Sequence, residues 1–586
     1  MEDELKSFTP LGLLTFVVIG LVACSDESSV SSGNEAYQQS LDESSSSSSR
    51  HSGLDPESSS GRDGGSSSAM TKSTSSSNKA TSSSWIASTS SSSWQALSST
   101  PRNDVSSSSR LSGLDPESSS KSAPDTTKII YSLKRFDGPL PNPHKGFTVV
   151  VGGTWTFVPE CEYGPNGSWQ NKAWDIVTYG SGYFQWNKVN PEKGVYNWDE
   201  IDAILDACEK HGLGYALRVL PYSSSMGRKN NYTIESDYDW TPKFVYDMGA
   251  KKDYATFDGK TLAVPRWDDP IYLQAAKDFA TALAQKYDGD PRLEYIDIRS
   301  FGNWGEWHIS HFDGSQMPAE NVLIDMLDHY ASVFKKTLLV LPSNGYGNVY
   351  THALSLGITK RDDGFIGIPG TPDSLVRAYK ANLPTVAENI AGYTTMLNYT
   401  DIIPGGYLKW TPERWVNAIT TAHLTYYVLD QDSDDGYYFY KDNKALADSM
   451  TKVIGYNFTV SKAELLTVAS TKDTLSALNI TVQNTGVAPC FFNVYLVAEF
   501  VDSTGVSLVQ LGKTTLIPKG TFKDGASQDF SFTYKVQSGQ SNAAKPGSTI
   551  ALALYDSEED FKSGKNPTVR FDNDGLLKNK KLLLKK

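Results

Sequence analysis

The sequence lacks the features that define three large protein classes. It has no excess of positive charge, because 54 Lys and Arg stand against 67 Asp and Glu for a formal net charge of −13; this argues against a general nucleic-acid binder. It has no glycine-rich phosphate loop of the GxGxxG or GxxxxGKS/T type, which argues against a nucleotide-binding doubly wound sheet. After Thr126, no stretch approaches the roughly eighteen apolar residues of a membrane span.

Cysteine is also scarce, with four in 586 residues. Cys161, Cys208 and Cys490 have unrelated spacings, which predict neither a disulfide framework nor a metal site. Cys208 falls on the apolar stripe of a helical pattern, so we expect a buried thiol there. The sequence contains no cofactor motif, and we expect neither a cofactor nor a bound metal.

Apolar residues nearly disappear between Ser25 and Asp125, where serine dominates. Such a segment buries too little surface to offset the entropy of ordering, which predicts a disordered, flexible tether. The remaining residues have ordinary globular composition and are rich in aromatics. We therefore divide the chain into a signal at 1–24, a Ser-rich linker at 25–126, a barrel at 127–459 and a β-sandwich at 460–586.

An apolar run of signal-peptide length, Leu11–Ala23, precedes the tether. It ends in Leu21–Cys24 (LVAC), which resembles the lipobox of bacterial lipoproteins, whose cysteine is lipidated. The resemblance implies an exported protein that is anchored to a membrane of the cell envelope or cell surface through lipid on Cys24. Residues 2–4 are acidic, whereas such signals normally begin with a basic region. A cleaved secretory signal and an uncleaved membrane anchor are the alternatives.

Between Asn142 and Gln431, short apolar runs alternate with longer runs of helical period. This alternation is typical of parallel strands joined by helices, and eight units over about 290 residues match a (β/α)8 TIM barrel, an α/β fold. The expected strands are Gly146–Gly152, Gly182–Trp186, Gly214–Pro221, Leu293–Phe301, Thr337–Pro342, Gly364–Ile368, Pro384–Asn389 and Leu424–Leu429. The expected helices are Asn197–His211, Asp269–Tyr287, Ala319–Phe334, Ser374–Lys380 and Pro412–Ala422.

From about Val460 the pattern changes to short alternating runs separated by turn signals. This pattern predicts an antiparallel, all-β sandwich. The region contains no Trp, so a structural companion of the barrel is favoured over a carbohydrate-binding module. The expected strands are Leu478–Val482, Phe492–Val501, Ser507–Leu511, Asp529–Tyr534 and Thr549–Tyr555.

Two of the expected barrel strands end in carboxylates, and the C-terminal strand ends of such a barrel carry its chemistry. After the fourth strand, Glu306 stands between Trp304 and Trp307. These rings offer flat faces for sugars, and we expect them to raise the pKa of the carboxyl by desolvation. The seventh strand ends in Glu388, which is costly to bury unless it is paired or functional. Two carboxylates on facing strand ends are the equipment of glycosidic bond cleavage, so Glu306 and Glu388 are the predicted catalytic pair.

The segment Phe184–Trp198 (FQWNKVNPEKGVYNW) resembles a segment of the clan A glycoside hydrolases, particularly the β-galactosidase-like family 42. Asn142–Phe147 and Asn484–Pro489 are similar to segments of uncharacterised bacterial proteins of domain-of-unknown-function type, which pair such a barrel with a β-rich domain. The resemblance implies a retaining glycoside hydrolase acting on a poly- or oligosaccharide. It assigns the acid/base role to Glu306 and the nucleophile role to Glu388.

One position departs from the clan pattern. Clan A enzymes usually place Asn directly before the acid/base Glu, where this chain has Gly305; Asn303 and Asn344 are the residues available to replace it. The departure keeps open a second hypothesis, a non-catalytic surface lipoprotein that binds glycans on a degenerate barrel. A third hypothesis, metal-dependent chemistry at His308 and His311, lacks a third clustered ligand.

Further side chains are expected around the carboxylate pair. Arg218, Asp297 and Arg299 are expected to point into the barrel, either as a buried ion-pair network or as substrate contacts. Trp186 closes the second strand, either as a sugar-stacking platform or as part of the core. The predicted substrate-binding residues are therefore Trp186, Arg218, Asn303, Trp304, Trp307, His308 and Asn344.

Overall fold

A computed structural model describes residues 125–153, 173–223, 239–257, 260–309, 316–342, 347–400, 407–429, 435–469, 473–537 and 549–585. The predicted lipidation site Cys24, the Ser-rich linker, Asn344 and His311 lie outside the described residues. Within these ranges no helix combines the length and the apolar character needed to cross a membrane.

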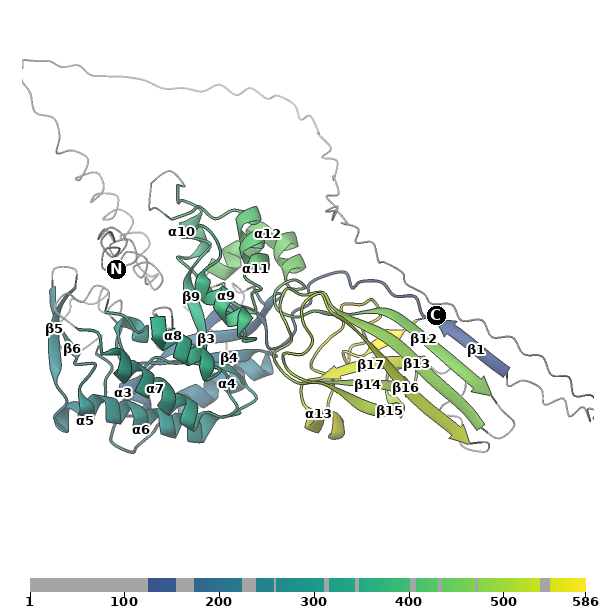
Figure 1. The fold of residues 1–586 in the computed structure, drawn as a ribbon, viewed down its shortest axis with the longest axis horizontal. Coiled ribbons are helices and arrows are strands. Elements are labelled where there is room, and N and C mark those ends of the chain that lie inside the picture. The colour runs from purple at the N-terminus through teal and green to yellow at the C-terminus, as the bar shows by residue number, and fades with distance from the viewer. Residues whose placement is uncertain are drawn as a thin grey trace, which may run out of the picture. The chain divides into compact units, whose positions relative to one another are not determined.

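Eight parallel strands close into a barrel and follow one another around it in chain order (Figure 1). The last strand pairs with the first, with Tyr426 opposite Gly146. The predicted (β/α)8 barrel is therefore confirmed. Its strands are β2 (Gly146–Gly153), β3 (Val177–Gln185), β4 (Gly214–Leu220), β7 (Leu293–Asp297), β8 (Leu339–Leu341), β9 (Thr359–Phe365), β10 (Val386–Asn389) and β11 (Tyr426–Val428).

Helices connect the strands, and all five predicted helices are present. The Asp269 carboxylate accepts hydrogen bonds from the backbone of Ile271 and Tyr272 and so begins one of them, with Pro270 in its first turn. The predicted helices are α4 (Asp199–Lys210), α6 (Pro270–Tyr287), α7 (Glu320–Val333), α9 (Asp373–Lys380) and α11 (Pro412–Thr421). Others are α3 (Trp186–Val189), α5 (Lys243–Asp247), α8 (Gly347–Ser355), α10 (Tyr393–Met396) and α12 (Asp435–Met450).

Several elements of the barrel differ from the sequence-based expectation. The second strand was expected at Gly182–Trp186 but spans Val177–Gln185, and Trp186 begins α3. The fourth strand ends at Asp297 instead of Phe301. The sixth strand was expected at Gly364–Ile368 but spans Thr359–Phe365. Its first five residues, TKRDD, are polar or charged, so the sequence pattern predicted a loop there. In the structure these side chains find polar partners, and the segment forms a strand. The hairpin of β5 (Lys252–Phe257) and β6 (Lys260–Pro265) was not expected at all. It is inserted between the third strand and its helix, α6.

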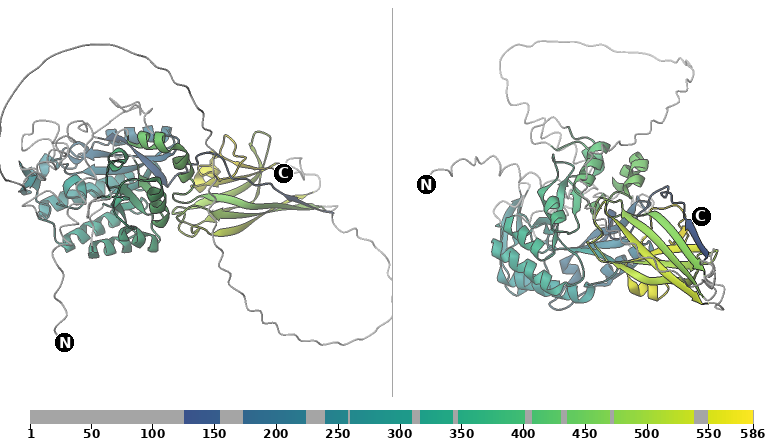
Figure 2. Two further views of the ribbon diagram at one scale, coloured as in Figure 1. Left: turned by 90° about the horizontal axis from the view of Figure 1, so that it is seen from above. Right: turned by 45° about the vertical axis from the view of Figure 1, so that its right-hand side comes forward.

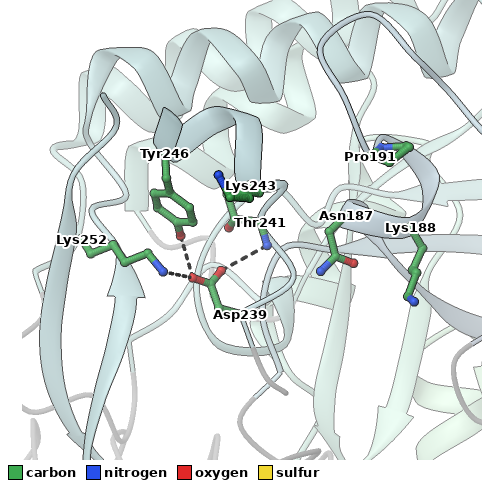
Figure 3. Close-up of a pocket in the computed structure, with 8 residues that line it drawn as sticks. All are labelled: Asn187, Lys188, Pro191, Asp239, Thr241, Lys243, Tyr246 and Lys252. Atoms are coloured by element: carbon green, nitrogen blue, oxygen red, sulfur yellow. Dashed lines mark hydrogen bonds and ion pairs between the residues drawn. The ribbon is translucent and has the colours of Figure 1, made fainter. Parts of the chain in front are cut away.

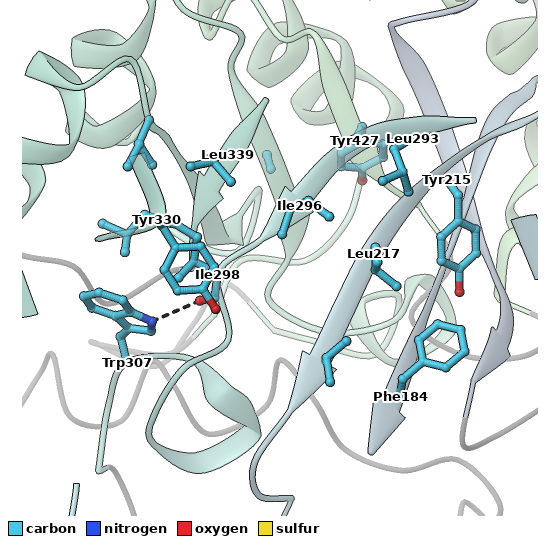
Figure 4. Close-up of a cluster of buried hydrophobic side chains, with 14 of the residues drawn as sticks. Phe184, Tyr215, Leu217, Leu293, Ile296, Ile298, Trp307, Tyr330, Leu339 and Tyr427 are labelled. Atoms are coloured by element: carbon cyan, nitrogen blue, oxygen red, sulfur yellow. Dashed lines mark hydrogen bonds between the residues drawn. The ribbon is translucent and has the colours of Figure 1, made fainter. Parts of the chain in front are cut away.

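The barrel core has two parts. Outward-facing residues of the fourth strand and its end, such as Ile296 and Ile298, pack beneath the helices (Figure 4). The predicted buried thiol Cys208 belongs to the same apolar cluster. Inside the barrel, the rings of Tyr179, Tyr295 and Tyr426 form a layer with centroids 5.4–6.0 Å apart. This aromatic layer closes the barrel below the charged residues described next.

The C-terminal region consists of two four-stranded antiparallel sheets that share one apolar core, which confirms the predicted sandwich (Figure 2). Val494, Leu496 and Leu511 from one sheet and Leu465, Leu478 and Ile480 from the other are buried in it. One sheet holds β1 (Asp125–Ile130), β12 (Phe458–Ala469), β13 (Asp473–Asn484) and β16 (Ser527–Gln537). The other holds β15 (Ser507–Ile517), β14 (Val494–Val501), β17 (Thr549–Tyr555) and β18 (Leu582–Leu584), with helix α13 (Glu558–Lys562) after β17.

The first described strand corrects the boundary drawn from the sequence. β1 pairs with β12 along its whole length, from Asp125 opposite Ala469 to Ile130 opposite Glu464. Residues 125–130 therefore belong to the sandwich: 125 and 126 are not part of the linker, and 127–130 are not part of the barrel. An extended segment that lies beside an edge strand gains a full ladder of backbone hydrogen bonds. This gain does not depend on how far apart the two strands are in the sequence.

Candidate active site

Seven charged side chains meet inside the barrel, and each is at most 6% exposed. They come from the third, fourth, sixth and seventh strands or from the loop that follows the fourth. Three are guanidinium groups and four are carboxylates, so opposite charges are mixed but unequal in number. The members are Arg218, Asp297, Arg299, Glu306, Arg361, Asp363 and Glu388.

Arg361 on β9 lies at the centre of this network. Its Nη1 is 2.6 Å from Asp297 Oδ2, and its Nη2 is 2.7 Å from Asp363 Oδ2. The same guanidinium approaches both predicted catalytic residues, at 3.2 Å from Glu306 Oε1 and 3.2 Å from Glu388 Oε2. Because a guanidinium is small and planar, this bridge keeps the two carboxylate oxygens within about 9 Å of each other.

Glu306 is the more strongly paired carboxylate. Its Oε1 is 3.0 Å from Arg299 Nη1, and its Oε2 accepts a hydrogen bond of 3.2 Å from His308 Nε2. Burial acts to raise the pKa of Glu306, but the hydrogen bond from His308 and the charges of Arg299 and Arg361 outweigh it and hold the pKa well below its usual range. The expectation that the two Trp rings raise this pKa is therefore wrong.

Glu388 has weaker partners. Besides Arg361, its Oε2 lies 3.7 Å from Arg218 Nη2. Burial raises the pKa of Glu388 to about 7; Arg361 and Arg218 oppose this shift, and the negative charges of Asp363 and Glu306 add to it. Near neutral pH the two predicted catalytic carboxylates thus differ in charge: Glu306 is ionised, whereas Glu388 retains its proton in about half of the molecules.

The loop that carries Glu306 is tightly folded. Gly305 has φ +66°, and a Cβ at this position would lie 2.8 Å from Arg299 Cβ and 3.0 Å from its backbone oxygen. Any residue with a Cβ at position 305 would therefore be strained for two reasons: its positive φ and its close contact with Arg299. The conformation of this loop thus requires a glycine where the clan pattern has an asparagine. Gly302, Trp304 and Trp307 in the same loop also have positive φ.

The three predicted sugar-stacking tryptophans have different surroundings. Trp186 is 3% exposed and packs against core aromatics of α6. Trp307 is 1% exposed, and its Nε1 donates to the Ile298 carbonyl (Figure 4). Neither ring has a free face for a sugar, so their assignment as substrate-binding residues is corrected to core. Trp304 packs with Leu220 and Trp240 at the edge of the network.

The predicted polar residues are closer to the network. Arg218 belongs to it, with Nε 3.4 Å from Asp297 Oδ2 and Nη1 donating to the Tyr183 hydroxyl at 3.1 Å. Of the two interpretations left open for Arg218, the buried ion-pair network is the one observed. His308 contacts Glu306 directly, whereas Asn303 is fully buried at the turn of the same loop.

Sequence reasoning missed Arg361 and Asp363. Both were placed in a loop before the sixth strand, because the segment Thr359–Asp363 contains no apolar residue. A signal was present in the spacing: Arg361 and Asp363 are two residues apart and so share one face of a strand. Within the described residues no group of three or more His, Cys, Asp or Glu side chains is placed to hold a metal ion.

Comparison with known proteins adds only distant likenesses. No family model and no curated protein matches the chain. Among solved structures, it is similar to a β-galactosidase from the psychrophilic Marinomonas ef1 (12% identity, TM-score 0.31, 52% of this chain) and spans 60% of that protein's length. It is also similar to xylanase B from Clostridium stercorarium F9 (10%, 0.29, covering 49% and 85%) and to a glycoside hydrolase family 30 subfamily 8 xylanase from Clostridium acetobutylicum (10%, 0.30, covering 68% and 98%). At these scores the likenesses carry no argument about activity.

Proposed function

We propose that this chain is a glycoside hydrolase whose catalytic pair is Glu306 and Glu388. One observation carries the proposal: two carboxylates from the fourth and seventh strand ends share the Arg361 guanidinium, while their surroundings shift their pKa values in opposite directions. Glycosidic bond cleavage needs one proton-bearing carboxyl and one ionised carboxylate on either side of the bond.

The charge states suggest a division of roles for a retaining reaction. Glu388 donates its proton to the glycosidic oxygen as that oxygen leaves the anomeric carbon, and a Glu306 oxygen forms a bond to this carbon. A water molecule then gives a proton to Glu388, and its oxygen displaces Glu306 from the anomeric carbon. The resemblance to clan A implies the reverse, with Glu306 as acid/base and Glu388 as nucleophile. The experiments below therefore test both assignments.

Glu306→Gln and Glu388→Gln test the pair on 4-nitrophenyl and 2,4-dinitrophenyl glycosides of several sugars. Each amide keeps the shape of the site, and we expect kcat to fall by about 10³-fold or more on the 4-nitrophenyl substrates. Circular dichroism checks that both variants stay folded. Wild-type hydrolysis of the 4-nitrophenyl glycosides that persists in either variant contradicts the pair.

The dinitrophenyl arm separates the roles, because a dinitrophenolate leaves without a proton. The acid variant should therefore lose little of its first step on this substrate, whereas the nucleophile variant should lose all activity. Retention in Glu388→Gln supports the roles given by the charge states. Retention in Glu306→Gln instead supports the roles implied by the resemblance.

Glycan binding without cleavage is the second candidate function. It is favoured by the burial of Glu306 and Glu388, each 1% exposed and each facing a guanidinium. A binding protein would retain oligosaccharides in affinity electrophoresis, keep this retention in both Gln variants and release no reducing sugar. The loss of sugar release in the variants of an active chain would remove this candidate.

We also propose that the chain is exported and held at a membrane of the cell envelope through lipid on Cys24. The apolar run before Cys24 and the Ser-rich tether after it support this proposal. Membrane fractionation of the wild type and of Cys24→Ala tests it. We expect the wild type in the membrane fraction and the variant in the soluble fraction; equal distribution would contradict lipid anchoring.

A further inference from the structure

A polar pocket of 410 Å³ lies outside the charged network, beyond the ends of the second and third strands (Figure 3). Asn187 and Pro191 line one side, from α3 and the turn that follows it. Lys243, Tyr246 and Lys252 line the other, from α5 and β5. The remaining lining residues are Lys188, Asp239 and Thr241.

Asp239 is the best-positioned group of this pocket. Its Oδ2 accepts hydrogen bonds from the Tyr246 hydroxyl at 2.8 Å and from Lys252 Nζ at 3.0 Å, and its Oδ1 accepts one from the Thr241 backbone at 3.1 Å. Burial and the neighbouring carboxylate raise the pKa of Tyr246, so its hydroxyl keeps the proton that it donates. The carboxylate is therefore held in place with acceptor capacity left over, since each of its oxygens has two lone pairs.

The pocket is connected to the candidate active site through Trp240. This residue stands between Asp239 and Thr241, and its carbonyl accepts a hydrogen bond of 2.8 Å from the Asn187 backbone. Its ring packs with that of Trp304 in the loop that carries Glu306. Trp240 thus lies in the chain between two residues that line the pocket, and its ring belongs to the same apolar cluster as Trp304 of the Glu306 loop.

An exposed aromatic ring lies two residues along β5 from Lys252, which lines the pocket. Tyr254 is 68% exposed, whereas Ala255 beside it is buried in the barrel core. Because residues two apart on a strand share a face, Tyr254 lies on the same outer face of β5 as Lys252. A large exposed ring next to a polar pocket is the arrangement that stacks on a sugar ring while the pocket binds hydroxyl groups.

We propose that Asn187, Asp239, Lys252 and Tyr254 form a subsite for an uncharged sugar unit of an oligosaccharide, away from the bond that is cleaved. This inference rests on the proposed function and adds a substrate class: chains of several neutral sugars. One hydroxyl of a vicinal pair would donate to Asp239, and the next would accept from Lys252 or Asn187. Tyr254 would stack on the adjoining unit.

The charges of the pocket favour a neutral ligand over an acidic one. Three lysines and one carboxylate line the pocket, and each lysine has a carboxylate near it. The Lys252 ammonium is paired with Asp239, Lys243 is paired with Asp247 on the same helix, and the charge of Lys188 acts on Glu200. A sugar carboxylate near Asp239 would meet a fixed negative charge in a partly buried place.

The full chain and its Asn187→Ala, Tyr254→Ala and Tyr254→Phe variants test the subsite with cellohexaose, xylohexaose, mannohexaose and 4-nitrophenyl monosaccharides. On a hexaose that is cleaved, we expect both Ala variants to raise KM about tenfold with kcat within twofold, and Tyr254→Phe to keep the wild-type KM. The 4-nitrophenyl monosaccharides do not reach this pocket, so their kcat/KM should stay within twofold. Unchanged KM on hexaoses, or an equal loss on both substrate types, overturns the subsite.

Direct binding separates this inference from the proposed function. Calorimetry with the three hexaoses and with hexagalacturonate is carried out in the Glu306→Gln background. If no substrate is cleaved, binding of a neutral hexaose that weakens in Tyr254→Ala but not in Tyr254→Phe still supports the subsite while the hydrolase proposal fails. No hexaose binding, no weakening, or tighter binding of hexagalacturonate overturns it.

Discussion

The barrel and the sandwich bury charge in different ways. In the sandwich, Lys581 and Glu499 form a buried pair with Nζ and Oε2 2.5 Å apart, and one charge balances the other. In the barrel, three guanidinium groups face four carboxylates in one network. An unequal network favours a proton on its least paired member, which here is Glu388, whose pKa is raised by burial.

The difference shows what the barrel interior is built to do. A single buried pair can be replaced by apolar residues with little loss of stability, so it is a poor marker of function. A network that lowers the pKa of one carboxylate and raises that of another at strand ends is the observation that supports the proposed catalytic pair. Three sets of variants test this contrast.

The largest effect is expected from removing the shared guanidinium. Arg361→Met removes the nearest guanidinium from Asp297, Asp363 and Glu388. We expect the free energy of unfolding to fall by about 5 kcal/mol. Lys581→Met leaves one carboxylate, Glu499, without its partner and should lower the free energy of unfolding by about 3 kcal/mol. Urea denaturation measures both. As a control, Lys581→Met combined with Glu499→Leu should recover most of the loss in the sandwich. Equal losses in the two single variants would remove the contrast.

The second effect is a pH dependence within the barrel. The pKa of Glu388 is raised from 4.5 to about 7 in the folded chain, so the stability it contributes is present below pH 4.5 and is lost as the pH rises to about 7. Glu388→Gln should remove this decline, worth about 3 kcal/mol by pH 8, in denaturation at pH 5 and pH 8. Glu306→Gln serves as the opposite case, because its lowered pKa gives stability above pH 4.5 that is lost as the pH falls. A parallel pH profile for wild type and Glu388→Gln would contradict the charge assignment.

The smallest effect is the difference in stability loss between alanine substitutions at two glycines of the same backbone conformation. Gly305 in the barrel and Gly525 in the sandwich have φ of +66° and +70°, but only Gly305 has a neighbour where a Cβ would stand. We expect Gly525→Ala to cost about 1 kcal/mol for the backbone alone, and Gly305→Ala about 2–3 kcal/mol because Arg299 is also displaced. Thermal unfolding measures the difference. Equal losses of stability in the two variants would mean that the Gly305 loop accommodates the added Cβ without strain.

Much of the fold could be predicted because its signals are local. The number and order of the eight barrel strands and the presence of five helices follow from hydrophobic periodicity, which depends on neighbouring residues only. The sixth strand was misplaced because its inward face carries Arg361 and Asp363, and periodicity cannot distinguish a charged barrel interior from a solvent-exposed loop. The strand β1 was misplaced because its partner β12 lies more than three hundred residues away.

The candidate site was predicted in part for the same reason. Glu306 and Glu388 were found because each ends a strand or follows one, and strand ends of a barrel converge. The burial of Trp186 and Trp307 was not predictable, because a tryptophan at a strand end has the same sequence signature whether it faces a cleft or the helix layer. The pocket at Asp239 depends on an inserted hairpin that has no signal in the barrel pattern.

The sequence by itself determined the order and type of the elements and the two carboxylates at the strand ends, because these depend on side-chain pattern along the chain. Only the tertiary structure decided that Arg361 joins Glu306 to Glu388, that one of them keeps a proton near neutral pH, and that Gly305 excludes an asparagine. The physical reason is that pKa values and steric limits are set by groups a few ångströms away in space, and these groups come from four different strands.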